Sequence, residues 1–366
     1  MTAARELVRR LAQRGHNVDV VTSTIVGLEE QPARRSHVAV VDGATVHYLA
    51  TPLRYRWMGI TPTLPFALRR LAQPDVVQVF GFRDPVTTGT AAWCRVRGVP
   101  YVFEPLGMFA PRVRKLRLKR LLDSTLYRGV ASGAAAIVAV SAREREEVIA
   151  GGVPPEKVRV RGNGFPEPPP AGEGDARGRL GIPGEAPLVL YVGRLATGKG
   201  LEHLAAAARS LDGVHVVVVG PDDRHGAAAR LDGAERVHVL PPTESPPFEL
   251  YRAADVFVLP SAGESFGMVA AEAAAVGTPV VLTDRCGVAS FFRDGEALVV
   301  PDERDEVIAA IRRVLADDAL RAQLGEGGIA AAKRMSWDNV VDLQEAIYRE
   351  IATSRTVSTN ASTLES

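Results

Sequence analysis

Two glutamates, Glu264 and Glu272, stand eight residues apart across a turn that leads into an alanine-rich stretch. Gly277 and Pro279 follow that stretch, so the sequence predicts a helix that ends there. At about 1.5 Å of rise per helical residue, eight residues span roughly 12 Å. The open amides of a helix start bind anions, and carboxylates accept hydrogen bonds from sugar hydroxyls. The order carboxylate, amides, carboxylate therefore suits a ligand with hydroxyls at both ends and anions between, such as a sugar–diphosphate–ribose.

A surface helix with two solvated glutamates is the alternative interpretation of this pair. The small side chains of the segment count against it, because they allow close backbone approach on several sides. These small residues are Gly267, Ala270, Ala271, Ala273 and Ala274.

A second polar cluster lies on a glycine-rich turn, where Arg194 and Lys199 fall between Gly193 and Gly200. Two cations among glycines suit a diphosphate and would stabilise its charge as a leaving group. The alternative is a helix-entry turn with two exposed cations. The turn also matches the Gly-x-x-x-x-Gly-Lys pattern of an ATPase phosphate loop. Because Gly200 stands where the Mg²⁺-binding Ser or Thr belongs, we rank that function lower.

The elements that must position these residues are short apolar runs alternating with helical stretches. Such runs, bounded by Gly, Pro or Asp, are typical of strands buried on both faces of a parallel sheet. The helices between them are expected to be right-handed crossovers, which predicts two doubly wound α/β domains, each Rossmann-like. The predicted strands are Val18–Val21, Val46–Leu49, Val76–Phe80, Tyr101–Phe103, Ala136–Val140, Leu188–Val192, His215–Val219, Val237–Leu240, Val256–Leu259, Pro279–Leu282 and Ala297–Val300.

The domain boundary is predicted near 162–183, where the Pro- and Gly-rich stretch 162–170 suits neither a helix nor an inner strand. We expect a first domain at 1–165, a second at 166–335, a closing helix at 336–352 capped by Ser336, and a disordered polar tail at 353–366. The chain opens on an amphipathic helix, without the strand and Gly-rich turn that start a doubly wound domain. Either the natural protein starts upstream or the domain begins on a helix, and we expect the former.

These motifs resemble the family 4 retaining glycosyltransferases of the GT-B fold over almost the whole chain. The resemblance implies two Rossmann-like domains that face a cleft, with the donor bound in the second and the closing helix returning to the first. It also implies transfer of a sugar from a nucleoside-diphosphate sugar with retention of configuration and without a metal ion or other cofactor. The residues that carry it are Gly193-Arg194-Leu195, Lys199-Gly200, Glu264, Glu272, Ser265-Phe266-Gly267, Gly277-Thr278-Pro279-Val280 and Asn163-Gly164.

Individual roles follow from the same resemblance. Arg194 and Lys199 would hold the donor diphosphate, Glu264 would contact the donor sugar, and Glu272 would bind the ribose. The base would stack near Val237–Leu240, around Val239. Backbone at the remaining donor-site positions would line the sugar and phosphates; these are Gly193, Ser265, Phe266, Gly267, Met268 and Val269.

The first half departs from the family pattern at residue 106. Family members often carry a His here in a Pro-His-Gly-Met run, and this chain has Leu106, which can neither donate a hydrogen bond nor move a proton. Glu104 is the acceptor-side candidate: it supplies polar chemistry or it pairs with a nearby Arg, and the sequence favours neither. Activity is still expected, because the leaving phosphate oxygen can accept the acceptor's proton.

Residues 111–122 interleave six cations with Val and Leu. Such a segment can lie on an anionic membrane at about 1 kcal/mol per cation, or it can be a core-facing helix with a solvated basic face. Because lipid-linked acceptors are common in the family, membrane contact and a core-facing helix are equally favoured interpretations of this segment. We therefore expect a cytoplasmic protein, free or peripheral at the inner face of the cell membrane, with a glycan or lipid-linked acceptor.

Composition narrows the possible partners. A net charge of +1 gives no reason to expect nucleic acid, and Cys94 and Cys286 are too far apart to suggest a disulfide framework or a metal site. The resulting hypothesis is a retaining hexosyltransferase. Its association with the family further suggests a role in cell-surface polysaccharide synthesis. Its rivals are a nucleotide-sugar-binding protein with degenerate activity, a nucleotide-sugar epimerase and, ranked lower, the ATPase.

Overall fold

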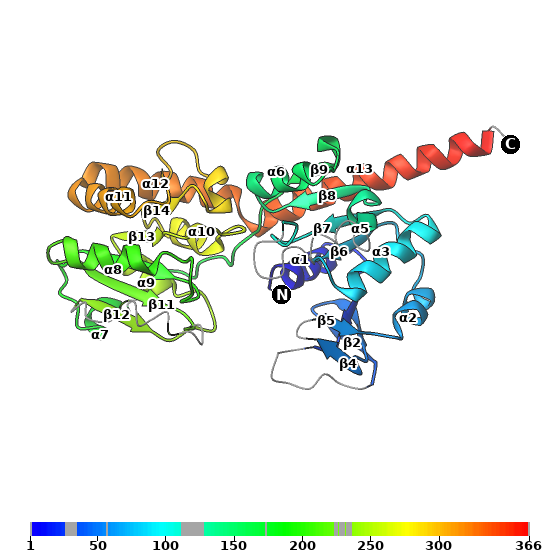
Figure 1. Cartoon of the computed structure of the whole chain (residues 1–366), viewed down its shortest axis with the longest axis horizontal. Helices are drawn as coiled ribbons and strands as arrows, with labels where there is room; N and C mark the ends of the chain where they lie inside the picture. Colours follow the sequence, from blue (N-terminus) through cyan, green and yellow to red (C-terminus); the bar gives the residue numbers. More distant parts are fainter. Residues whose placement is uncertain are drawn as a thin grey trace. The chain divides into compact units, whose positions relative to one another are not determined.

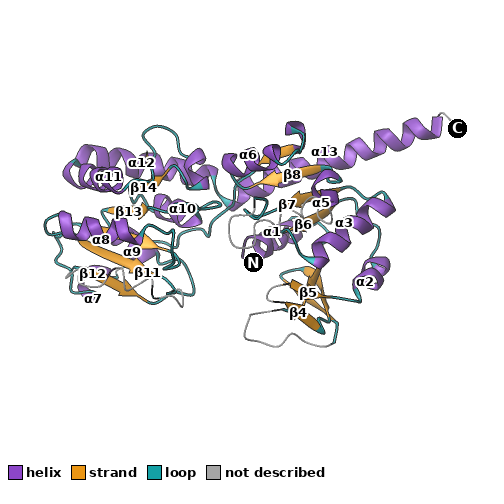
Figure 2. Cartoon of the chain, viewed as in Figure 1, coloured by secondary structure: helices purple, strands orange, loops and turns teal. Residues whose placement is uncertain are grey.

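The computed structural model describes residues 2–25, 35–55, 58–110, 128–172, 174–222, 226, 231 and 236–364. The chain divides into two compact units, one formed by residues 1–161 with 340–366 and the other by residues 162–339. Helices and parallel strands alternate in both units (Figures 1 and 2). Residues 111–122, for which the sequence allows membrane contact and a core-facing helix equally, lie outside the described residues.

The second unit is built on one six-stranded sheet, wholly parallel, in the order β12-β11-β10-β13-β14-β15. Numbered within the unit, this is the 3-2-1-4-5-6 order of a doubly wound fold, so the predicted α/β class is confirmed. The predicted strands of this half agree with the observed ones to within one residue at each end. Their bounds are β10 Leu188–Val192, β11 His215–Val219, β12 Val237–Leu240, β13 Val256–Leu259, β14 Val280–Thr283 and β15 Leu298–Val300.

Two groups of helices cover this sheet. Helix α8 (Leu201–Ser210) packs with α11 (Arg304–Ala316), while α10 (Met268–Ala275) packs with α9 (Phe248–Ala253) and α12 (Asp318–Arg334). Because parallel crossovers are right-handed, the change of direction in strand order between β10 and β13 puts the two groups on opposite faces.

Helix α10 is alanine-rich because it is enclosed by protein. Ala270, Ala271, Ala273 and Ala274 are fully buried, and α12 lies directly against them. A Cβ atom added at Gly325 of α12 would lie 2.6 Å from the carbonyl oxygen of Gly277. Small side chains on both helices therefore set the close approach of α10 and α12.

The first unit centres on a four-stranded parallel sheet in the order β6-β7-β8-β9. One face packs on helices of the first half, and the other packs on the closing helix α13 through Ile347 and Ile351. The strands are β6 Val77–Phe80, β7 Tyr101–Glu104, β8 Ala136–Ala139 and β9 Val158–Val160. The described helices of this unit are α1 Thr2–Gln13, α2 Leu64–Arg70, α3 Pro85–Arg97, α5 Arg128–Ser132, α6 Ala142–Ala150 and α13 Trp337–Leu364, with the short 3₁₀ turn η2 Pro155–Lys157. The short elements α7 Ala176–Arg179 and η4 Gly287–Phe291 belong to the second unit.

The remaining strands of the first unit form sheets that the sequence analysis did not predict. A separate three-stranded sheet has the order β1-β3-β2, and β4 (Leu53–Tyr55) pairs with β5 (Met58–Ile60). β2 runs antiparallel to β3 across Asp42 and Gly43, whose φ angles are +52° and +84°. Asp-Gly is a strong signal for a two-residue hairpin turn, although this hairpin was not among the predicted elements. The three strands are β1 Asp19–Ser23, β2 His37–Val41 and β3 Ala44–Leu49.

The closing helix begins near the predicted residue but continues further. The Ser336 hydroxyl accepts a hydrogen bond from the Asn339 amide at 3.4 Å, as a capping residue does. Helix α13 then continues to Leu364, through the tail for which disorder is predicted. Residues 353–364 contain neither Gly nor Pro, so no strong helix breaker ends it earlier.

A buried polar network joins α13 to the sheet of the first unit. Arg161 donates to Glu104 at 2.7 Å and also to Gln344. Gln78 donates to the other Glu104 oxygen at 3.0 Å and accepts from Gln344 and Tyr348, each at 3.2 Å. Arg161 is 3% exposed and Glu104 is 0% exposed, so removing either partner strands a charge in the interior.

We predict that Arg161→Ala lowers the opening free energy of β7 and α13 by about 3–5 kcal/mol, the usual cost of breaking a buried ion pair. Native-state hydrogen exchange on peptides from these elements measures that energy. The matched control is Arg159→Ala, whose pair with Glu350 is 35% and 55% exposed and is expected to contribute less than about 1 kcal/mol. Equal effects of the two variants would contradict the prediction.

Candidate functional site

The turn that follows β10 lies against neighbouring turns backbone to backbone. Gly200 has φ of +71°, and a Cβ there would lie 1.9 Å from the carbonyl oxygen of Pro260. Gly220, with φ of +150°, would place a Cβ 1.9 Å from the carbonyl oxygen of Gly193. Only glycine fits at these two positions, so the turns after β10, β11 and β13 come into direct contact.

The turn that follows β13 is held by the segment after β14. The Glu264 amide donates to the carbonyl of Arg285 at 3.2 Å, and the Gly287 amide donates to the Glu264 carbonyl at 3.0 Å. The Val288 amide donates to the Phe266 carbonyl at 2.8 Å. These bonds fix the direction in which the chain enters α10 and hold the Glu264 backbone in place.

The two polar clusters meet through their side chains. The Lys199 ammonium donates to the Glu264 carboxylate, and the two side chains are 14% and 26% exposed. The Ala262 amide also donates to the Gly198 carbonyl at 3.0 Å, while Arg194 is exposed on the same turn. β10 and β13 are the neighbours at which the strand order changes direction, which is where open α/β sheets bind ligands at their carboxyl ends.

Glu272 lies deeper, in the second turn of α10. It is 5% exposed, and one of its carboxylate oxygens accepts a hydrogen bond from the Tyr251 hydroxyl at 2.9 Å. Burial raises the pKa of Glu272, and the hydrogen bond from Tyr251 opposes that rise. Burial also raises the pKa of Tyr251, so that the phenol stays a donor. Tyr251 is a site residue that was not predicted, because no sequence motif marks an aromatic residue in the helix before β13.

The backbone between the two glutamates enters α10 through Gly267, whose φ is +105°. A Cβ at Gly267 would lie 2.9 Å from a Leu259 methyl. The Phe266 ring points into the interior, 3% exposed and edge-on to Phe291 at 5.3 Å. With the Phe266 ring turned inward, Gly267 presents main chain without a side chain at this turn, and the first amides of α10 have no partner within the helix.

Val239 is the predicted donor residue that stands apart from this cluster. It lies on β12, the edge strand, with β11 between it and β10, and its side chain is 46% exposed. It is in register with Val218, which is in register with Tyr191. Val239 is therefore near the same end of the sheet as the turns but two strands away from them.

In the first unit, Glu104 is completely buried and engaged by Arg161, which is one of the two roles the sequence left open for it. Leu106 follows with a left-handed φ of +55°, and Arg83 has +63°. Arg83 donates to the carbonyls of Met108 and, at 2.9 Å, of Phe109. Left-handed backbone at non-glycine residues is strained, and hydrogen bonds hold this loop in that shape.

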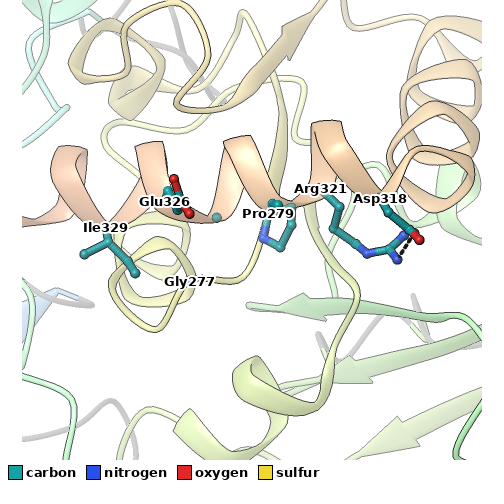
Figure 3. Close-up of a pocket in the computed structure, with 8 residues that line it drawn as sticks. Gly277, Pro279, Asp318, Arg321, Glu326 and Ile329 are labelled. Atoms are coloured by element: carbon teal, nitrogen blue, oxygen red, sulfur yellow. Dashed lines mark hydrogen bonds and ion pairs between the residues drawn. The ribbon is translucent and has the colours of Figure 1, made fainter.

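A shallow groove of about 420 Å³ lies elsewhere on the second unit (Figure 3). Figure 3 shows Asp318 and Arg321 of α12 at one end, where they are ion-paired, and Ile329 at the other. Gly277 and Pro279 lie just before β14 starts. The groove is thus at the amino end of a strand, opposite to the end where Lys199 and Glu264 meet, and it belongs to a different surface.

Neither a metal centre nor a membrane-spanning helix is found among the described residues. In that part of the chain, no cluster of three or more His, Cys, Asp or Glu side chains has an arrangement that could hold a metal ion. Among the same residues, no helix has the length and apolar character needed to cross a membrane.

Comparison with known proteins identifies relatives of both halves. The model of the Glycosyl transferase 4-like domain matches residues 2–164, and the model of Glycosyl transferases group 1 matches residues 173–331. D-inositol 3-phosphate glycosyltransferase 1 of Catenulispora acidiphila is 32% identical over 94% of this chain and 88% of its own length. The D-inositol 3-phosphate glycosyltransferase of Acidothermus cellulolyticus is 37% identical over 57% of this chain, and the chain spans 51% of that relative's length.

Solved structures share the fold at lower identity. Sucrose-phosphate synthase from Thermosynechococcus elongatus superposes with a TM-score of 0.74 and 23% identity, covering 96% of this chain and 93% of that one. The Anabaena protein HepE in complex with UDP gives a TM-score of 0.72 and 19% identity, covering 96% and 95%. From these family models, relatives and folds, we conclude that the chain belongs to the family 4 glycosyltransferases, which have the GT-B fold.

Proposed function

We propose that the chain is a retaining glycosyltransferase that moves a hexose from a nucleoside-diphosphate sugar to an acceptor hydroxyl. The observation that carries the proposal is the Lys199–Glu264 contact, which joins the two polar clusters of the sequence. Both clusters lie where a 3-2-1-4-5-6 sheet has its ligand crevice.

The charges around this crevice suit such a donor in order along its length. Arg194 and Lys199 would hold the diphosphate together with the open amides of α10. Glu264 would meet the sugar hydroxyls, and Glu272 the ribose hydroxyls. Because Lys199 already neutralises Glu264 in the free protein, the sugar end of the crevice presents a neutral pair instead of a bare carboxylate that would repel the diphosphate.

The chemical step needs little from the protein beyond positioning and charge. The bond between the anomeric carbon and the phosphate oxygen breaks, and its electron pair leaves with the diphosphate. The acceptor hydroxyl oxygen bonds to the same face of the anomeric carbon, and its proton passes to the leaving phosphate oxygen. Arg194 and Lys199 would stabilise the charge that develops on that oxygen. We propose that no metal ion is required.

The names of similar proteins support a starting choice of donor and acceptor. HepE binds UDP, which makes UDP the first nucleotide to try. The relatives from Catenulispora and Acidothermus are named for D-inositol 3-phosphate, so a phosphorylated polyol belongs in the acceptor panel. The glycan or lipid-linked acceptor, the role in polysaccharide synthesis and the place at the cytoplasmic membrane face remain proposals from sequence.

We predict that one of UDP, GDP and ADP raises the thermal midpoint of the protein, with or without EDTA. At 100 times its dissociation constant, a ligand adds about 2.7 kcal/mol, or roughly 5–10 °C for a domain of this size. Glu272→Gln should weaken that nucleotide about tenfold or more, because a hydrogen bond to a charged acceptor is replaced by a weaker one. Glutamine still accepts from Tyr251, so the fold is expected to survive.

The control for this measurement is Glu306→Gln, which removes an exposed carboxylate of the same unit and should leave the shift unchanged. Stabilisation by Mg-ATP alone would contradict the donor site and favour the ATPase.

We predict that Lys199→Ala lowers kcat for acceptor-dependent release of the nucleoside diphosphate about 10²- to 10³-fold, since one stabiliser of the leaving group is lost. Release is measured with the nucleotide sugar and acceptor panel, and the anomeric proton coupling of the product reports retention. Lys333→Ala, at an exposed position on α12, is the control and should match the wild type. Product formed without acceptor would indicate an epimerase, and binding without turnover would indicate a degenerate binding protein.

A further inference from the structure

The Gly277-Thr278-Pro279 turn has no role in the function proposed so far, although it is one of the motifs that mark this chain. Thr278 is 3% exposed, and its hydroxyl donates to the Tyr251 carbonyl oxygen at 2.7 Å. Its amide donates to the Ala273 carbonyl at 3.2 Å. One residue therefore ties the end of α10 to the middle of α9.

The Tyr251 side chain is buried, and contacts hold both its ring and its hydroxyl. It is fully buried, edge-on to the Phe257 ring at 5.6 Å and tilted against the Phe248 ring at 5.9 Å. With the ring packed and its backbone held by Thr278, the hydroxyl has a single direction, which is toward Glu272 at 2.9 Å.

Glu272 gains orientation from this contact. A glutamate has three rotatable side-chain bonds, and ordering them on ligand binding costs free energy. The Tyr251 hydroxyl occupies one lone pair of one carboxylate oxygen and leaves the others open to further donors. The carboxylate is therefore set in place before any ligand arrives.

We propose that Tyr251 is a positioning residue for ribose recognition: its phenol aims the Glu272 carboxylate at the ribose hydroxyls of the nucleoside diphosphate, and Thr278 holds Tyr251 for that task. This inference rests on the proposed function of the site and adds to it a chain of three residues, Thr278, Tyr251 and Glu272.

The test compares UDP with 2′-deoxy-UDP and 3′-deoxy-UDP by calorimetry, with the corresponding GDP and ADP series in parallel. The wild type should bind the ribonucleotide about tenfold or more tightly than at least one deoxy analogue, because losing a hydrogen bond to a charged group changes the dissociation constant by about that factor. Tyr251→Phe should reduce that preference severalfold with little effect on the deoxy analogue. In a Glu272→Ala background, where no side chain is left for Tyr251 to position, Tyr251→Phe should have no further effect on the preference, because coupled residues are not additive.

Loss of packing alone would produce a different result. Tyr101→Phe is the matched control: Tyr101 is a buried tyrosine of the other unit whose hydroxyl donates to the Val130 carbonyl at 2.7 Å. It should lower the thermal midpoint without changing the ribose preference. Thr278→Val should act in the same direction as Tyr251→Phe, and Thr278→Ser, which keeps the hydroxyl, should restore the wild-type preference.

The outcomes separate this inference from the function on which it rests. If Glu272→Gln abolishes the ribose preference while Tyr251→Phe preserves it, the positioning role is wrong and the donor site stands. If no nucleoside diphosphate binds the wild type, the proposed function fails and this inference fails with it. Additive effects of Tyr251→Phe and Glu272→Ala would also overturn the positioning role.

Discussion

A Cβ atom at residue 200 would lie 1.9 Å from the carbonyl oxygen of Pro260, so any side chain at this position would clash with the backbone. The absence of that atom lets the turn after β10 rest on the turn after β13. The other features of the site depend on this approach, because Lys199 is next to Gly200 and Glu264 is four residues after Pro260. A glycine in left-handed backbone thus brings together two charged residues that are 65 positions apart.

The two glutamates of the site have the same chemistry and different surroundings. Glu264 is partly exposed and pairs with a cation, Lys199. Glu272 is buried and meets a neutral phenol, Tyr251. A buried carboxylate without a cation has a raised pKa, so its interior position is unfavourable unless hydrogen bonds compensate. Tyr251 supplies one such bond, and hydroxyls of a ligand would supply more, which makes Glu272 the glutamate whose environment a ligand would improve most.

Sequence reasoning succeeded where a signal is local. Strands of the second unit are continuous apolar runs, and runs buried on both faces can be found without knowing their neighbours. It failed at β9, a strand of three residues with Arg159 in its middle, and at β2, where the Asp42-Gly43 signal was present and overlooked. Tyr251 was beyond prediction for another reason: its value depends on Glu272, 21 positions away, and only tertiary packing relates them. The same holds for the direct contact of Lys199 with Glu264.

The first unit raises the question of how a chain with Leu106 in place of a histidine can serve the same chemistry. The backbone of Leu106 is left-handed, with φ of +55°. Side chains from other elements hold the loop in this shape. The buried carboxylate of Glu144 accepts from the amides of Gly107 and, at 2.9 Å, of Val140, while Arg83 holds the carbonyls beyond. These contacts are made by residues other than Leu106, so the shape of the loop does not depend on a hydrogen bond from the side chain at residue 106. Under the proposed mechanism the acceptor's proton goes to the leaving phosphate oxygen. The loop therefore needs to shape the site and does not need a group that transfers a proton, so a leucine at residue 106 is compatible with the chemistry.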